Sequence, residues 1–111
     1  MNHRLIERPD AVVVQLAGDI DLDSSPAARK VLLDALHRSR PVFVDLSAVT
    51  YIDSSGIASL IEAFQRARTM GVQFMLTDVA EPVMRVLSLA RLDRVLPIDS
   101  RPHGGLQQSR K

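Results

Sequence analysis

The sequence contains no cysteine and no tryptophan, and only 4% of its 111 residues are aromatic. Without cysteine, disulfides, thiol catalysis and cysteine-ligated metals are excluded. Phe43, Phe64 and Phe74 lie in apolar segments, where they fit a core. A surface that stacks nucleic-acid bases needs exposed aromatic side chains among basic ones, and the sequence offers no such segment.

The sequence also lacks a large excess of charge of either sign, and it lacks long apolar runs. Fourteen Lys and Arg residues against 13 Asp and Glu residues leave a net charge of +1, without the basic excess of a nucleic-acid-binding domain. The arginines are scattered, as on solvated helix faces. No apolar run approaches the roughly 20 residues that span a bilayer, and none near the start resembles a secretory signal. We therefore expect a cytoplasmic protein with no nucleic-acid binding and no membrane insertion.

What is present is an alternation of strand and helix patterns in a chain of one-domain length. Val12, Val14 and Leu16 alternate as in a strand, whereas residues 41–46 are almost continuously apolar, as in a strand buried on both faces. Ser25 and Pro26 are typical of a helix start. Strands are predicted at 4–7, 11–18, 41–46, 72–77 and 94–98, and helices at 26–38, 55–70 and 82–90.

This order predicts an α/β domain over residues 1–98. Its sheet is expected to be small and mixed, mostly parallel, with four or five strands and about three helices. Residues 47–53 are predicted to connect a strand to the next helix. Residues 99–111 lack periodicity and are rich in glycine, polar and basic residues, so we predict a flexible tail there.

Asp53, Ser54, Ser55 and Gly56 stand where a strand-following loop enters a helix. Ordinary capping explains such residues, and the local pattern alone favours it, with Ser54 as the N-cap. However, one cap needs one side chain, and glycine inside a first turn destabilises a helix. A phosphate on a serine at this point would meet free backbone N–H groups and the positive end of the helix dipole. Capping and phosphorylation both remain open on these residues alone.

Catalysis by one of these serines is not predicted. A hydrolase elbow reads Gly-x-Ser-x-Gly, and this stretch lacks the first glycine. A triad also needs a histidine base, but His3 and His103 lie near the termini and His37 near a helix end. No Gly-x-x-x-x-Gly-Lys loop is present to bind a nucleotide. We predict that the protein is not an enzyme and needs no cofactor.

Three alternating carboxylates, Asp19, Asp21 and Asp23, form a second candidate site. They resemble the start of a calcium loop, but Ser24 and Lys30 occupy the positions that require Gly and Glu. No metal site is therefore predicted. The loop is either an ordinary acidic helix approach or a source of charge beside the serines. Because both loops follow strand ends, they are expected to share one edge of the sheet.

Three segments together resemble a known family: "AGDID", "VFVDLSAVTYIDSSGIASLIEAFQRAR" and "GVQFMLTDVAEPVMRVLSLARLDRVLPI". Over residues 11–98 the chain is similar to STAS domains, above all the stand-alone bacterial anti-sigma factor antagonists. The resemblance implies that Ser55 is phosphorylated by a serine kinase of histidine-kinase-like ATPase fold, which is also the anti-sigma factor. The unphosphorylated protein would bind this kinase and release the sigma factor. Phosphorylation would abolish binding, and a PP2C-type phosphatase would restore it.

The resemblance also implies a set of partner-binding residues. These are Asp19, Asp21, Asp53, Ser54, Ser55, Gly56, Ile57 and Ser59. ATP would belong to the kinase. An alternative within the family is an accessory subunit that uses the same face to grip the ATPase of a lipid-transport ABC complex. A small-ligand or nucleotide-binding role has no support beyond the α/β fold.

Overall fold

The computed structural model describes residues 1–99, which form a five-stranded sheet with three helices. This confirms the predicted α/β class. The strands are β1 (Asn2–Glu7), β2 (Val12–Ile20), β3 (Val42–Ile52), β4 (Phe74–Thr77) and β5 (Ile98–Asp99). The helices are α1 (Ser25–Leu36), α2 (Ser54–Met70) and α3 (Glu81–Leu89), followed by the 3-10 turn η1 (Leu92–Arg94).

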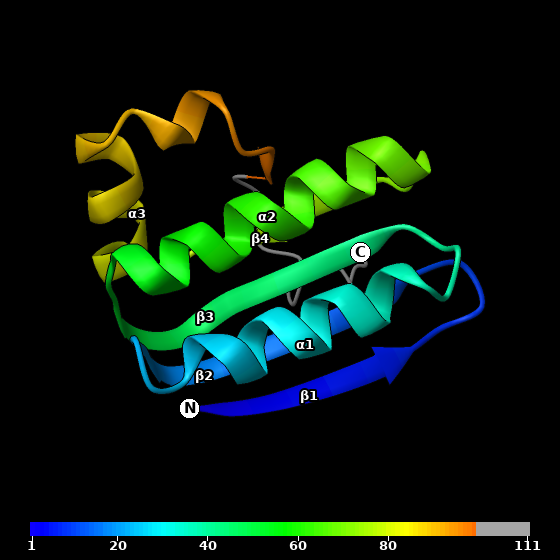
Figure 1. The fold of residues 1–111 in the computed structure, drawn as a ribbon, viewed down its shortest axis with the longest axis horizontal. Coiled ribbons are helices and arrows are strands. Elements are labelled where there is room, and N and C mark those ends of the chain that lie inside the picture. The colour runs from blue at the N-terminus through cyan, green and yellow to red at the C-terminus, as the bar shows by residue number, and fades with distance from the viewer. Residues whose placement is uncertain (100–111) are drawn as a thin grey trace, which may run out of the picture.

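The strands lie in the order β1-β2-β3-β4-β5, with β1 antiparallel to β2 and every other neighbouring pair parallel. In parallel strands the carboxyl ends point the same way, so the chain leaves β2 and β3 at one edge of the sheet. Figure 1 shows α1 and α2 side by side across one face of the sheet, with α3 packed near the end of β3 at which α2 begins. The starts of α1 and α2 therefore meet at that edge.

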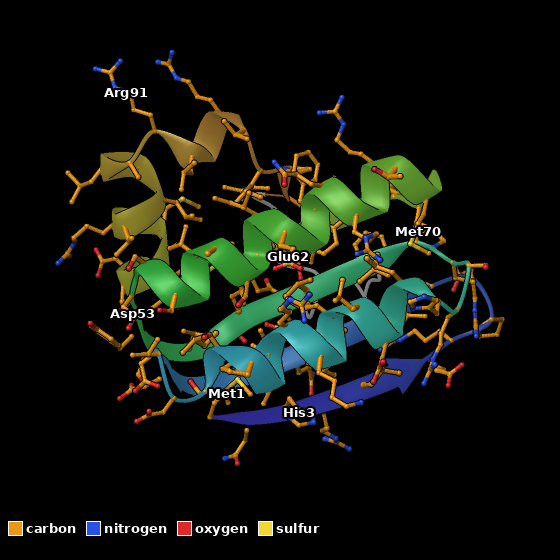
Figure 2. The ribbon with its side chains drawn as sticks, viewed as in Figure 1. Met1, His3, Asp53, Glu62, Met70 and Arg91 are labelled. Carbon is orange, nitrogen blue, oxygen red and sulfur yellow. The ribbon has the colours of Figure 1, made fainter. Side chains whose placement is uncertain are left out.

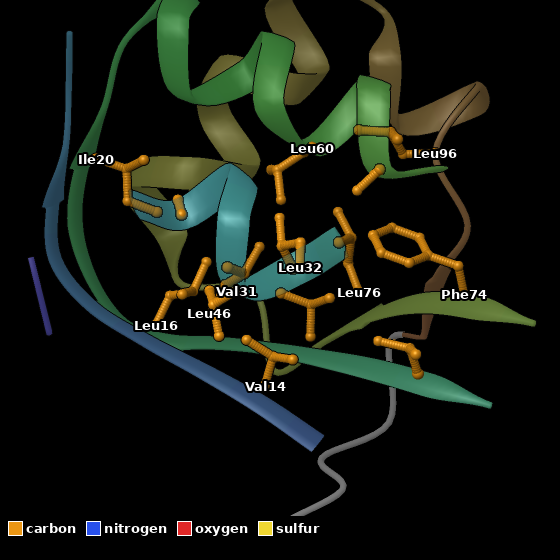
Figure 3. Packing of buried hydrophobic residues seen from close by; sticks show 14 of the residues in the cluster. Val14, Leu16, Ile20, Val31, Leu32, Leu46, Leu60, Phe74, Leu76 and Leu96 are labelled. Carbon is orange, nitrogen blue, oxygen red and sulfur yellow. The ribbon is translucent and has the colours of Figure 1, made fainter. Parts of the chain in front are cut away.

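The core lies between the sheet and the helices. Val14, Leu16 and Leu76 from the strands face Leu32 and Leu60 from the helices, as Figure 3 shows. The apolar face of α1 is buried along its whole length. Its members are Ala28, Val31, Leu32, Ala35 and Leu36.

The strand β3 is longer than predicted, because residues 47–52 continue it rather than forming a connection. Two register shifts interrupt its pairing with β2, between Gln15 and Ala17 and between Gly18 and Asp19. Such irregularities break the two-residue alternation that identifies a strand in a sequence. The extension carries β3 out to Ile52, directly beside Ile20 of β2.

The end of the domain also differs from the prediction. Residues 94–98 were expected to be a strand, but only Ile98 and Asp99 pair with β4. Before them, Arg91 adopts a left-handed conformation with φ of 61° and starts the turn η1. Asp99 thus belongs to the sheet. Residues 100–111, the rest of the predicted tail, lie outside the described residues. No helix within residues 1–99 is long and apolar enough to cross a membrane.

Candidate functional site

The candidate site is the sheet edge at which β2 leads into α1 and β3 leads into α2. We call it the switch edge and define it as residues 19–25 and 50–59. Its two segments are neighbours: Asp19 pairs with Tyr51 and Ile20 with Ile52, and Asp53 N–H donates to the Ile20 carbonyl at 3.2 Å. In Figure 2, Asp53 and Met70 mark the two ends of α2, with Asp53 at the switch edge. The predicted sharing of one edge is therefore confirmed.

The acidic loop of the switch edge is folded around Asp21. The Asp21 carbonyl accepts from the N–H groups of Ser24 and Ser25 at 3.1 and 2.7 Å, and its carboxylate accepts from the N–H groups of Asp23 and Ser24. Hydrogen bonds from the backbone and then the side chain of Ser24 hold the pKa of the Asp21 carboxyl below its ordinary value. Asp21 is therefore ionised at neutral pH and fixed in direction.

Ser24, not Ser25 as predicted, is the N-cap residue of α1. Its hydroxyl does not bond to the amides of the helix. Instead it accepts from Asp21 N–H at 2.9 Å and lies 2.9 Å from the Asp19 carbonyl oxygen, within donating distance. Ser25 is buried one position further on. The predicted N-cap is therefore wrong by one residue. The Ser24 side chain stabilises the loop before the helix instead of bonding to the helix itself.

Asp19, the first predicted carboxylate, is tied to the neighbouring strand. Thr50 Oγ1 donates to Asp19 Oδ1 at 2.7 Å. This bond joins two segments that are 31 residues apart in the sequence. The contact between Thr50 and Asp19 was not foreseen, because it depends on the irregular register of β2 and β3.

Asp53, not Ser54, is the N-cap of α2. Its backbone is extended, with φ of −107° and ψ of −172°. Its Oδ1 accepts from Ser55 N–H at 2.9 Å and from Gly56 N–H at 3.1 Å. The expectation of free amides for a phosphate at this helix start is therefore corrected, because one carboxylate already occupies two of them.

Replacing Asp53 tests this cap. Asp53→Ala should lower the free energy of unfolding by about 0.5–2 kcal/mol, because two amides of α2 lose their acceptor. Asp53→Asn is the matched control and should stay close to the unmodified protein, since asparagine caps about as well as aspartate. Urea unfolding measures both. Equal stability of the alanine variant and the unmodified protein would contradict this account of the cap.

Gly56 is held against β2 and β3. A Cβ atom at this position would lie 2.6 Å from Ile52 Cγ1 and 2.7 Å from the Ile20 carbonyl oxygen. The backbone at Gly56 therefore lies close to the protein's own strands. Glycine lets the first turn of α2 sit directly on the ends of β2 and β3.

Ser59 joins the two helix starts. Its hydroxyl lies 3.3 Å from the Ser25 carbonyl oxygen of α1 and 3.2 Å from the Ser55 carbonyl oxygen within α2. Its side chain is buried, as is Ile57 in the first turns of α2. Both buried residues therefore pack beneath the exposed surface of the switch edge and fix its position.

Metal binding finds no support within residues 1–99, where no three His, Cys, Asp or Glu side chains gather as a metal site. The shallow hollow lined by Gln65, Arg68 and Thr69 is at the other end of α2, far from the two serines in the chain. The chemistry available at the switch edge is that of hydroxyls and carboxylates.

The STAS domain family matches residues 3–104 of this sequence, and the sheet order and helix placement described above fit it. The chain belongs to the STAS domain family. Among curated relatives, this STAS chain is similar to the anti-sigma-B factor antagonist of Bacillus subtilis. The two are 26% identical over 96 residues, which cover 86% of this chain and 88% of the relative.

Solved STAS structures share its fold. An anti-sigma factor antagonist from Mycobacterium paratuberculosis superposes with a TM-score of 0.79 at 22% identity, covering 99% of this chain and 94% of the other. The Bacillus cell fate determinant SpoIIAA in its phosphorylated form superposes with a TM-score of 0.69 at 14% identity, covering 98% of this chain and all of the other.

The predicted site residues of this STAS chain separate into two groups. Gly56, Ile57 and Ser59 are buried, so they support the switch edge and add little or no surface of their own. The others reach solvent: Ser54 and Asp19 are exposed, and the rest are partly exposed. This exposed group comprises Asp19, Asp21, Asp53, Ser54 and Ser55.

Two exposed apolar residues of the switch edge were missed. Leu22 is 72% exposed and Tyr51 is 51% exposed. Leu22 lies between two aspartates in the loop, and Tyr51 lies beside Asp19 on the adjacent strand. A single leucine within an otherwise polar loop was the available signal, whereas the exposure of Tyr51 depended on recognising that β3 continues to Ile52.

Proposed function

We propose that this STAS protein is an anti-sigma factor antagonist regulated by phosphorylation of Ser55. Unphosphorylated, it binds a serine kinase that also acts as the anti-sigma factor, and the sigma factor is released. Phosphorylation of Ser55 ends the binding, and a PP2C-type phosphatase restores it. The observation that carries the proposal is one rigid edge that presents two hydroxyls beside three fixed carboxylates, those of Asp19, Asp21 and Asp53.

The Ser55 hydroxyl is suited to accept a phosphoryl group. Among residues 1–99, neither Ser54 Oγ nor Ser55 Oγ has a hydrogen-bond partner, whereas the Ser55 N–H and carbonyl are both engaged. The backbone is therefore fixed while the hydroxyl can approach a nucleotide. The anti-sigma factor antagonists among the relatives support the choice of partner, and a phosphorylated form is known for SpoIIAA, which shares the fold.

The transfer itself requires a donor held by the kinase. Ser55 Oγ attacks the γ-phosphorus of ATP, the bond from that phosphorus to the β,γ-bridging oxygen breaks, and ADP leaves. The serine proton passes to a base of the kinase. The STAS protein supplies the acceptor oxygen and its position, so it is a substrate and regulator, not an enzyme.

The negative charge of the phosphoserine accounts for release of the protein from the kinase. Immediately after transfer, the phosphoserine carries about two negative charges and faces the phosphates of ADP, with the Asp53 carboxylate close behind it on the same helix start. Repulsion between these anions in a contact from which water is excluded is strong. Binding is therefore lost without any need for the fold to change.

Intact mass measurement tests the assignment. Incubation with the purified cognate anti-sigma kinase and ATP should add one phosphate to the unmodified protein and to Ser54→Ala, but none to Ser55→Ala. Ser54→Ala is the matched control, because Ser54 is the neighbouring exposed hydroxyl. Addition of phosphate to Ser55→Ala, or to none of the three proteins, contradicts the proposal.

A further inference from the structure

Two large apolar side chains of the switch edge lie in water, although both are suited to burial. Five large apolar residues within residues 1–99 are exposed. They are Leu22, Tyr51, Met70, Leu89 and Val95. Leu22 and Tyr51 belong to the switch edge, one in each of its two segments. Exposed apolar residues are ordinary when single, but two on one short functional edge indicate a contact surface.

Both side chains are presented by fixed backbone. Tyr51 lies in β3, where it pairs with Asp19 of β2. Leu22 lies in the loop that Asp21 and Ser24 close with several hydrogen bonds. Little conformational freedom would be lost on binding, which favours such residues as anchors.

The two segments that carry these side chains contain acidic side chains and no basic ones. Residues 19–25 and 50–59 carry four carboxylates and no Lys or Arg. Asp21 and Asp23 flank Leu22 in the chain, and Asp19 and Asp53 are near Tyr51, one beside it in the sheet and one two positions later. Each exposed apolar side chain thus has carboxylates next to it in the chain or in the sheet, and apolar anchors of protein interfaces commonly have polar residues around them.

We infer that Leu22 and Tyr51 are the anchors of the partner contact, and that the partner offers an apolar recess rimmed by Arg or Lys side chains. The inference rests on the proposed function and specifies the chemistry of its partner surface. The anchors supply most of the affinity, and the carboxylates orient the approach of the cationic rim.

Charge complementarity excludes the other occupants. A second copy of the chain related by a two-fold axis would place the same carboxylates against one another. An anionic bilayer would repel the four carboxylates, because such surfaces attract basic segments. A basic protein surface with an apolar recess is the partner that satisfies both features.

Affinity measurements on surface variants test the anchors. With the purified cognate anti-sigma kinase, Leu22→Ser and Tyr51→Ser should each weaken binding by about tenfold or more. Leu89→Ser and Val95→Ser are matched controls, because those residues are also strongly exposed but lie at α3 and η1, outside the switch edge. They should bind like the unmodified protein. Tyr51→Phe should also bind normally, since the ring is the anchor.

The rim is tested by salt. Raising the salt concentration from about 0.05 to about 0.5 M should slow association of the unmodified protein, and this dependence should weaken in Asp23→Asn. Thermal unfolding of each variant confirms that the exposed substitutions leave the fold intact.

The outcomes separate the two proposals. If Leu22→Ser and Tyr51→Ser bind as well as the unmodified protein while phosphorylation still ends binding, the anchors are refuted and the proposed function stands. If the kinase does not bind the unmodified protein, the proposed function falls and the inference falls with it. Binding to phosphatidylserine vesicles that depends on Leu22 or Tyr51 would also refute the inference, because it would identify a lipid surface instead.

Discussion

Phosphorylated on Ser55, the protein is expected to bind its kinase at least a hundredfold more weakly than the unmodified protein. A hundredfold corresponds to about 2.7 kcal/mol of binding free energy. A dianion placed in a desolvated contact, beside the capping carboxylate of Asp53, loses its hydration and meets the phosphates of the bound nucleotide. Isothermal titration of the ADP-bound kinase with both forms measures the difference.

Two variants bracket this result. Ser55→Ala should bind as tightly as the unmodified protein, because removing a hydroxyl adds no charge. Ser55→Asp should fall between the two forms, since a carboxylate carries one charge and lacks the third oxygen of a phosphate. Binding of the phosphorylated protein within tenfold of the unmodified protein would show that the switch acts elsewhere.

Replacement of Gly56 by alanine is expected to destabilise the protein by about 1–3 kcal/mol, the usual cost of overpacking. The direction is informative, because glycine to alanine inside a helix ordinarily stabilises it by up to about 1 kcal/mol. Here the new Cβ would lie within 2.8 Å of three atoms, among them the Ile20 carbonyl oxygen, which is backbone and not readily displaced. Crowding therefore outweighs propensity.

The matched control reverses the substitution on the same helix. Ala58 is exposed in α2, so Ala58→Gly should cost up to about 1 kcal/mol by propensity alone. Urea unfolding should thus show both variants below the unmodified protein, for opposite reasons. A Gly56→Ala variant as stable as the unmodified protein would mean that α2 does not rest on the ends of β2 and β3 as described.

The elements with regular periodicity were predictable from sequence. The predicted location of α1 and the predicted end of α2 at residue 70 agree with the structure, in which Gly71 follows α2 in a left-handed conformation with φ of 72°. Both depend on contacts between residues close in the chain. The fold class followed from the alternation of such elements, because parallel strands need crossover connections.

The details of the site were less predictable, because they depend on residues far apart in the chain. Asp53, Ser54 and Ser55 are all suitable caps, and only the extended backbone at Asp53 selects the first of them. The continuation of β3 to Ile52 required pairing with β2 across two register shifts. The exposure of Tyr51 followed from that pairing, so the sequence alone gave no sign of it.

The hydrogen bonds that join the two segments of the switch edge have a consequence for the kinetics of partner exchange. Asp53 bonds to Ile20, Thr50 to Asp19 and Ser59 to Ser25, so each link spans about thirty residues of chain. Opening one segment strains the other, and the two should exchange their amide hydrogens as a single cooperative unit. A binding surface that is already ordered can be recognised on first encounter. The rate at which the protein exchanges one partner for another would therefore be set by dissociation of the first partner.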